Sequence, residues 1–228
     1  TKMIEKIIDI NPKSHEGMFL KGRMHLIKGE FNDAIIFLQP YLKDNPNVPM
    51  GHYLLGLAHL GNRDNQQAKT ELIEAVKLNP KWKEARLTLA DLYLKTGAFD
   101  PAIEEAEEVL KNDPRSMQAH SILGNAHLHK RDILKSQKSF EEVVGIAPNN
   151  PIGYYHVGRT LLVQKREKEA LAQFEKSLSI QPNFVDSLNL IVAIYVNQKE
   201  NKKAIERVEA QVKVSPQNPF FYNMLGSL

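Results

Sequence analysis

Histidine offers the most obvious chemistry in this sequence, because an imidazole can bind a transition metal or exchange a proton near neutral pH. Two metal ligands on one helix must lie three or four residues apart to face the same ion. His127 and His129 are only two residues apart, so on a helix they would point to different sides. Five of the eight histidines recur at two fixed places of a 34-residue repeat described below, and the family resemblance given there implies that these places pack between paired helices: His25, His52, His59, His120 and His127. We therefore predict packing histidines and no metal site.

The side chains needed for other reactions do not form a recognisable motif. The chain has no cysteine, which excludes thiolate nucleophiles, disulfides and cysteine-ligated zinc. It also has no His-Glu-x-x-His sequence, no glycine-rich phosphate loop and no Ser/His/Asp cluster. The acidic run from Glu104 to Glu108 is typical of a solvated outer helix face. The sequence thus predicts a non-catalytic protein without a cofactor.

Composition and charge exclude several classes of protein. With 42% hydrophobic and 25% charged residues, the chain has the composition of a folded protein and not of a disordered one. A formal net charge of +3 gives no indication of nucleic-acid binding, and no apolar run approaches the ~18 residues of a membrane span. A chain without cysteine suits the cytoplasm and the periplasm or envelope of a bacterium equally, so the compartment stays open. The chain begins with Thr1, and we expect a fragment of a longer protein.

Prolines mark a regular period along the chain. Seven of the twelve prolines follow one another at intervals of 34 residues: Pro12, Pro46, Pro80, Pro114, Pro148, Pro182 and Pro216. A fixed period of this length predicts an array of structural repeats. The full repeats then lie at 15–48, 49–82, 83–116, 117–150, 151–184 and 185–218, with partial repeats at 1–14 and 219–228. Positions 1 to 34 below are counted from the start of each repeat.

Each repeat has the pattern of two helices. Apolar residues recur at steps of three and four within each half, and short polar turns such as 61–64 separate the halves. A glycine inside a helix costs about 1 kcal/mol relative to alanine, so we expect small residues at positions 8 and 20 to allow close packing of two antiparallel helices. Position 8 holds Gly22, Gly56, Ala90, Gly124, Gly158 and Val192, and position 20 holds Ala34, Ala68, Ala102, Ser136, Ala170 and Ala204. The proline at position 32 ends the second helix, because it lacks an N–H and disfavours helical geometry just before it.

Two places depart from this pattern, and a third indicates where a second helix begins. Val192 is a large residue at position 8, which predicts a splayed sixth hairpin. Pro40 lies inside the second helix of the first repeat and should kink it. Asp100 precedes Pro101, which is the pattern of an N-cap followed by proline at the first helical position.

The 34-residue period, the small residues at positions 8 and 20 and the proline at position 32 resemble the tetratricopeptide repeat. The resemblance covers the whole chain, although the aromatic positions of the family (4, 11 and 24) are only partly filled here, with Phe140 and Phe174 at position 24. It implies an all-α fold, a right-handed α-solenoid of antiparallel helix hairpins, with residues 1–228 as a single array. Residues 1–14 have the pattern of a second helix and 219–228 that of a first helix, so we expect the array to continue beyond both ends.

The resemblance also implies that the first helices line a concave groove, with positions 2, 5, 9 and 13 facing a partner. Aromatic and arginine side chains at such positions favour binding. The alternative is that the aromatic rings only fill the gap between neighbouring helices. The predicted groove residues are Phe19, Arg23, Tyr53, Leu57, Asp91, Asn125, His129, Tyr155 and Arg159.

The predicted function is that of a non-catalytic scaffold that binds a protein or peptide segment. Position 5 carries no lysine and position 6 has no run of asparagines, unlike the family members that clamp chaperone tails or form nucleocytoplasmic sugar transferases. The overall sequence resembles those of bacterial tetratricopeptide proteins associated with exopolysaccharide export and protein sorting at the envelope.

Three other functions stay open. The chain can be the repeat region of a larger enzyme or export assembly whose catalysis lies outside it, or it can self-associate through exposed terminal repeats. An RNA reader of the related helical class with a slightly longer repeat is disfavoured by the strict period of 34 and the charge of only +3.

Overall fold

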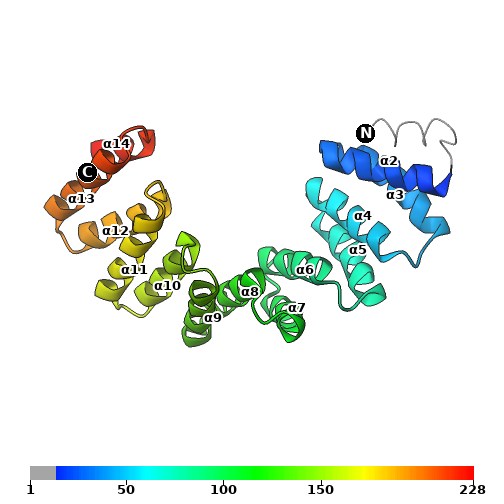
Figure 1. Ribbon diagram of the computed structural model, residues 1–228, viewed down its shortest axis with the longest axis horizontal. Coiled ribbons are helices and arrows are strands. Elements are labelled where there is room, and N and C mark those ends of the chain that lie inside the picture. The colour runs from blue at the N-terminus through cyan, green and yellow to red at the C-terminus, as the bar shows by residue number, and fades with distance from the viewer. Residues whose placement is uncertain (1–13) are drawn as a thin grey trace. The chain divides into compact units, whose positions relative to one another are not determined.

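The computed structural model describes residues 14–228 and divides the chain into two compact units (Figure 1). The described residues form thirteen helices and no strand, as the sequence predicts. The first unit, which ends at Pro114, contains α2 (His15–Lys28), α3 (Phe31–Asp44), α4 (Pro49–Gly61), α5 (Asn65–Leu78), α6 (Lys83–Lys95) and α7 (Phe99–Asn112). The second unit, which begins at Arg115, contains α8 (Met117–His129), α9 (Ile133–Ile146), α10 (Pro151–Val163), α11 (Glu167–Ile180), α12 (Val185–Asn197), α13 (Asn201–Val214) and α14 (Pro219–Gly226).

Consecutive helices pair as hairpins, the architecture of an α-solenoid. The paired helices are α2/α3, α4/α5 and α6/α7 in the first unit and α8/α9, α10/α11 and α12/α13 in the second. Residues 1–13, with Pro12 and nearly all of the partial repeat expected at 1–14, lie outside the described residues. Within the described part of the chain, no helix is both long and apolar enough to cross a membrane.

Small residues at position 8 allow the two helices of a hairpin to touch. A Cβ atom added to Gly124 would lie 2.6 Å from the ring of Phe140, and one added to Gly158 would lie 2.5 Å from the ring of Phe174. Both rings belong to position 24 and are fully buried. In the sixth hairpin, where Val192 replaces the small residue, the backbones of α12 and α13 come into close approach at fewer places than those of the other pairs, which is consistent with the expected splay.

The turn inside each hairpin places one residue, at position 15, in the left-handed region. Gly29 and Gly97 have φ angles of 76° and 79°. In the other four turns the equivalent residue is not glycine and φ lies between 60° and 62°: Arg63, Arg131, Lys165 and Lys199. Residues with a Cβ atom adopt this conformation only at a cost, so the turn geometry is imposed by the packing of the two helices.

Replacing such a residue by glycine should stabilise the protein. For Lys165→Gly we expect the free energy of unfolding in urea to rise by about 0.5–1 kcal/mol, because the relief of about 1–2 kcal/mol of left-handed strain exceeds the extra chain entropy that glycine loses on folding. The same exchange at Lys138, an exposed residue within α9, should lower the free energy of unfolding by about 1 kcal/mol. A Lys165→Gly protein no more stable than the wild type would contradict this account of the turn.

The regularly spaced prolines mark the ends of the second helices. The helices α3, α5, α7, α9, α11 and α13 each end two residues before a proline of the 34-residue series, as predicted. Helix α3 continues through Pro40 to Asp44. The predicted start of α7 was wrong, because the helix begins at Phe99 with Ala98 as its N-cap and without a side-chain cap. Pro101 therefore lies at the third helical position, where its missing N–H would have had no partner within the helix.

Four of the position-4 side chains, which looked irregular in sequence, share one role. The side chain of Arg86 donates a hydrogen bond to the carbonyl oxygen of Pro80 at 2.6 Å, and His52 is paired with the Pro46 carbonyl at 2.9 Å. The hydroxyl groups of Tyr154 and Tyr222 donate to the carbonyl oxygens of Pro148 and Pro216 at 3.2 and 3.1 Å. In the sixth repeat position 4 is Leu188, and Gln211 of α13 donates to Pro182 instead, at 2.6 Å. Each of these links ties a repeat to the proline loop before it.

Candidate partner-binding surface

In the first unit, the predicted groove residues lie on α2, α4 and α6. The ring of Phe19 lies 5.0 Å from that of Tyr41, and the ring of Tyr53 lies 4.7 Å from that of Trp82. The two predicted anchors are half-buried and pack against the hydrophobic cores formed with neighbouring helices. These aromatic rings therefore do fill gaps between helices, the structural alternative considered above, while part of each ring stays accessible.

The remaining groove residues of the first unit differ in exposure and pairing. Arg23 on α2 is exposed and Leu57 on α4 is half-buried. Asp91 on α6 forms an ion pair with Lys95, one turn further along the helix, at 2.6 Å. Of these three, Asp91 already has a charged partner within the chain.

In the second unit, the predicted residues lie on the neighbouring helices α8 and α10. Asn125 of α8 donates a hydrogen bond to the backbone of Ser121 at 2.9 Å, and His129 ends the same helix. On α10, the Arg159 guanidinium lies over the ring of Tyr155, with 5.7 Å between its central carbon and the ring centroid. Tyr155 in turn packs edge-on against Phe184 at 5.4 Å. The α10 pair is thus positioned by contacts within its own unit.

A cavity of about 570 Å³ lies where the turn between α8 and α9 meets the end of α10. It brings together His129 and Arg159, two of the residues predicted from sequence. It also includes four residues that the sequence analysis did not select: Arg131 and Ile133 belong to the turn and the start of α9, and Leu128 and Val163 to the ends of α8 and α10. The lining residues are Leu128, His129, Arg131, Ile133, Arg159 and Val163.

The charge of this cavity is positive. Within residues 14–228, no carboxylate lies within ion-pair distance of Arg131 or Arg159. Burial, with a smaller contribution from the charge of Arg159, lowers the pKa of His156 to about 4. The imidazole of His156, beside Arg159, is therefore neutral at pH 7. The two guanidinium groups therefore present uncompensated positive charge beside apolar side chains.

An apolar stripe on α10 runs alongside this positive charge. Ile152 and Val163 are 44% and 56% exposed, and Tyr155 between them is half-buried. Exposed apolar side chains next to arginine are typical of surfaces that bind another chain. The α10 stripe and the cavity together can accept a carboxylate and a neighbouring apolar group.

The predicted packing histidines are in most cases half-buried, and His59 is fully buried. The His25 ring stacks on Phe37 with 5.3 Å between centroids, and His52 pairs with Glu71 at 2.7 Å. The acidic run 104–108 differs from its prediction as a wholly solvated face. Ala106 within it is fully buried, and Glu105 forms an ion pair with Arg86 on α6.

Comparisons with known proteins agree with this architecture. Family models of the tetratricopeptide repeat match residues 53–116, 87–151 and 153–184. No curated protein matches the sequence.

Three similar solved structures have TM-scores well above chance. The protein MamA (41-end) from Desulfovibrio magneticus RS-1 has a TM-score of 0.71 and 21% identity, over 75% of this chain and 96% of that chain. YrrB, described as a tetratricopeptide repeat protein with an unusual peptide-binding site, has a TM-score of 0.70 and 16% identity, over 82% and 96%. The C-terminal part of a repeat protein from Cytophaga hutchinsonii has a TM-score of 0.76 and 16% identity, over 98% and 92%. At these identities the likeness shows the fold alone.

The family models cover more than half of the 228 residues. In the matched region the helices contain the small residues of the repeat, and each second helix is followed by its proline. The chain therefore belongs to the tetratricopeptide repeat family.

Proposed function

We propose that this chain is a protein-interaction scaffold whose α8–α10 surface binds an extended protein segment through a carboxylate and an adjacent apolar side chain. The observation that carries this proposal is the cavity of about 570 Å³ that holds both Arg131 and Arg159, neither of them paired with a carboxylate in residues 14–228. A carboxylate in the cavity would receive charge-assisted hydrogen bonds from guanidinium groups, which are among the stronger polar contacts in proteins.

The stripe on α10 would contact the apolar part of the partner. Tyr155 is held by Phe184 and by the guanidinium of Arg159, so a partner gains its contact area with little loss of side-chain entropy. Ile152 and Val163 lie exposed on either side of it. Binding energy at such surfaces is concentrated in a few aromatic and arginine residues, and Tyr155 and Arg159 are the residues to which we assign that role.

The first unit carries a second set of residues suited to the same kind of contact. Phe19 and Tyr53 are half-buried anchors, and the exposed Arg23 has no carboxylate partner among residues 14–228. Leu57 would add apolar area and Asp91 a polar contact on the first unit, and Asn125 would add a polar contact on the second. We propose that each unit by itself can bind an apolar anchor of a partner.

Synthetic peptides provide a direct test. Peptides that combine a carboxylate with leucine or phenylalanine at varied spacing are screened on an array, and the tightest is titrated by fluorescence anisotropy. We expect Tyr155→Ala and Arg159→Ala each to weaken binding by about 10–100-fold, the equivalent of about 1.4–2.8 kcal/mol, with an unchanged helical circular dichroism spectrum.

Two controls separate this surface from the rest of the unit. Lys138→Ala and Glu142→Ala, both at exposed positions of α9, should leave the affinity unchanged. Replacing the peptide carboxylate by an amide should weaken binding to the wild type more than binding to Arg159→Ala, which retains only Arg131 in the cavity. Equal losses for the α9 variants, or an amide peptide that binds as tightly as the acid, would show that the proposed surface is not the binding site.

A further inference from the structure

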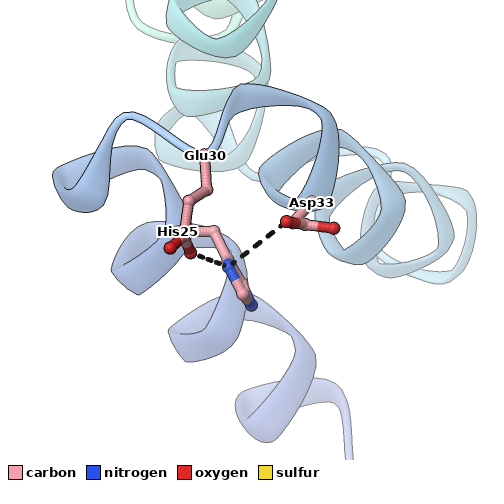
Figure 2. Close-up of side chains that lie close together, drawn as sticks. All are labelled: His25, Glu30 and Asp33. Atoms are coloured by element: carbon pink, nitrogen blue, oxygen red, sulfur yellow. Dashed lines mark hydrogen bonds and ion pairs between the residues drawn. The ribbon is translucent and has the colours of Figure 1, made fainter.

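Three possible metal ligands meet at the turn of the first hairpin, outside the surface described above (Figure 2). His25 comes from the last turn of α2, Glu30 is the N-cap residue of α3, and Asp33 lies in the first turn of α3. The His25 Nδ1 atom lies 2.6 Å from Glu30 Oε2 and 4.0 Å from Asp33 Oδ2. Their ligand atoms all lie within 4.8 Å of one another. Figure 2 shows the two carboxylates directed at the same nitrogen of the imidazole.

The backbone that carries this cluster is the same in all six hairpin turns. The N–H of Glu30 donates to the carbonyl oxygen of His25 at 2.9 Å, a bond from position 16 to position 11. The equivalent bond in the other five turns measures 2.8–3.0 Å: Asp64 to His59, Ala98 to Tyr93, Asp132 to His127, Arg166 to Leu161 and Glu200 to Tyr195. The six turns therefore carry different side chains at positions 11, 16 and 19 on the same backbone geometry.

Three of the other five turns pair opposite charges at positions 16 and 19. In the fourth and sixth repeats a lysine at position 19 pairs with the acid at position 16, at 3.3 and 2.9 Å, and the fifth repeat has the reverse pair at 2.6 Å. The second turn has His59 3.6 Å from Asp64, but its third residue is the neutral Gln67. The third turn has no charge at either position, with Ala98 and Pro101. The first turn alone among the six combines a histidine with two carboxylates.

No lysine or arginine offsets the negative charge of this arrangement. Among residues 14–228, neither forms an ion pair with Glu30 or Asp33, whose basic neighbour is the imidazole of His25. Lys21, on the same helix as His25, lies over the ring of Phe37 at 5.2 Å. Like charges three residues apart at a helix start repel each other unless a cation lies between them.

The histidine is oriented in advance, whereas the carboxylates can adjust. The imidazole of His25 is stacked on Phe37 with an angle of 8° between the rings, and its side chain is 19% exposed. The side chains of Glu30 and Asp33 are 45% and 56% exposed. An ion can thus enter from solvent on the carboxylate side while the ring plane stays fixed.

We infer that His25, Glu30 and Asp33 form a binding site for a divalent transition-metal ion, with Zn²⁺ as the ion that best fits one imidazole nitrogen and two carboxylate oxygens. Tetrahedral bonds of about 2.0–2.2 Å place ligand atoms about 3.3 Å apart. The 2.6 Å contact must widen and the 4.0 Å distance must shorten, which rotation of two exposed carboxylates achieves. Water would complete the coordination. The imidazole would bind the ion through Nδ1 and carry its one ring proton on Nε2, so a proton would be released to solvent only from a ring that was doubly protonated before binding.

Isothermal titration of the whole chain with zinc chloride near pH 7.5 tests the site, and the cobalt(II) absorption spectrum reports its geometry. We expect one tight equivalent in the wild type. The matched variant is Asp33→Gln, which gives position 19 the residue that the second turn carries there, Gln67, and removes one exposed ligand without touching the core. It should weaken zinc binding by at least about tenfold, and Asp33→Glu should retain the binding.

A second variant separates the metal site from a merely structural ion pair. His25→Tyr introduces the residue that the third and sixth turns carry at position 11, Tyr93 and Tyr195, so the hairpin is expected to fold, and zinc binding should be lost. The inference is wrong if the wild type takes up no more zinc than His25→Tyr, or if Asp33→Gln binds zinc as tightly as the wild type. Peptide binding at α10 should not change with zinc, so this test is independent of the proposed function.

Discussion

Gly124→Leu should lower the free energy of unfolding by more than about 2 kcal/mol, as measured by urea denaturation of the helical signal. A Cβ atom at Gly124 would already lie 2.6 Å from the ring of Phe140, which is fully buried. The larger side chain must displace that ring or separate α8 from α9, and overpacking of this kind typically costs about 1–3 kcal/mol or more. This is the largest effect that we expect from a single substitution in the chain.

Gly145 provides the matched control for this experiment. It lies in α9, and a Cβ atom added there would meet no packing partner within 4 Å, so Gly145→Leu should be neutral or stabilising through its helix propensity.

The register also predicts a compensating change, because the sixth repeat carries Val192 and Val208 at positions 8 and 24. Gly124→Val combined with Phe140→Val should be more stable than the sum of the two single changes. Additive effects, or a neutral Gly124→Leu, would contradict the contact between positions 8 and 24.

Gln211→Ser should lower the free energy of unfolding by about 1–3 kcal/mol, because it leaves the carbonyl oxygen of Pro182 without its donor. Gln211 is 3% exposed, so water cannot easily replace the amide. It also accepts a hydrogen bond from Arg207 at 2.9 Å, but Arg207 keeps its ion pair with Glu175 at 2.6 Å. The loss should therefore fall mainly on the loop that joins the fifth and sixth repeats.

The fifth repeat suggests how to restore this link. There position 4 is Tyr154, which donates to Pro148, and position 27 is Ser177. Adding Leu188→Tyr to Gln211→Ser reproduces that pair in the sixth repeat and should recover most of the lost stability. Unfolding curves of the single and double variants decide the matter. If the double variant is no more stable than Gln211→Ser alone, the position-4 side chain does not have the role assigned to it.

The fold class could be predicted from the sequence because its causes are local. Proline cannot continue a helix, so a proline every 34 residues marks the helix ends wherever the chain folds, and apolar steps of three and four select helices over strands. The one boundary predicted wrongly, at Asp100 and Pro101, shows the limit of local rules. In the turn between α6 and α7, position 15 is Gly97, and it has the same left-handed conformation as position 15 of the other turns. This geometry starts α7 at Phe99, although Asp100 would be a favourable N-cap.

The candidate surface was predicted only in part. Counting positions around a helix placed Tyr155 and Arg159 on one face of α10, and the structure adds that Arg159 lies over the Tyr155 ring. Arg131 could not be found in this way, because it belongs to a turn whose left-handed φ of 62° directs the chain toward a cavity that also includes α10. Position 15 is basic in four of the six repeats, Arg63, Arg131, Lys165 and Lys199, so the residue type alone gave no signal that singled out Arg131.

By itself the sequence determined the repeat, its two helices and the small residues between them, since each depends on the chemistry of residues close together in the chain. Only the tertiary structure decided which side chains of different type make the same hydrogen bond. His52, Arg86 and Tyr154 have little in common as residues, yet each is hydrogen-bonded to a proline carbonyl. His25 and Asp33 lie eight residues apart on two helices, a spacing that matches no single-helix motif. The hairpin turn brings them together because the chain reverses its direction between α2 and α3. The residue pattern along one helix does not indicate which residues of the next helix will lie beside it.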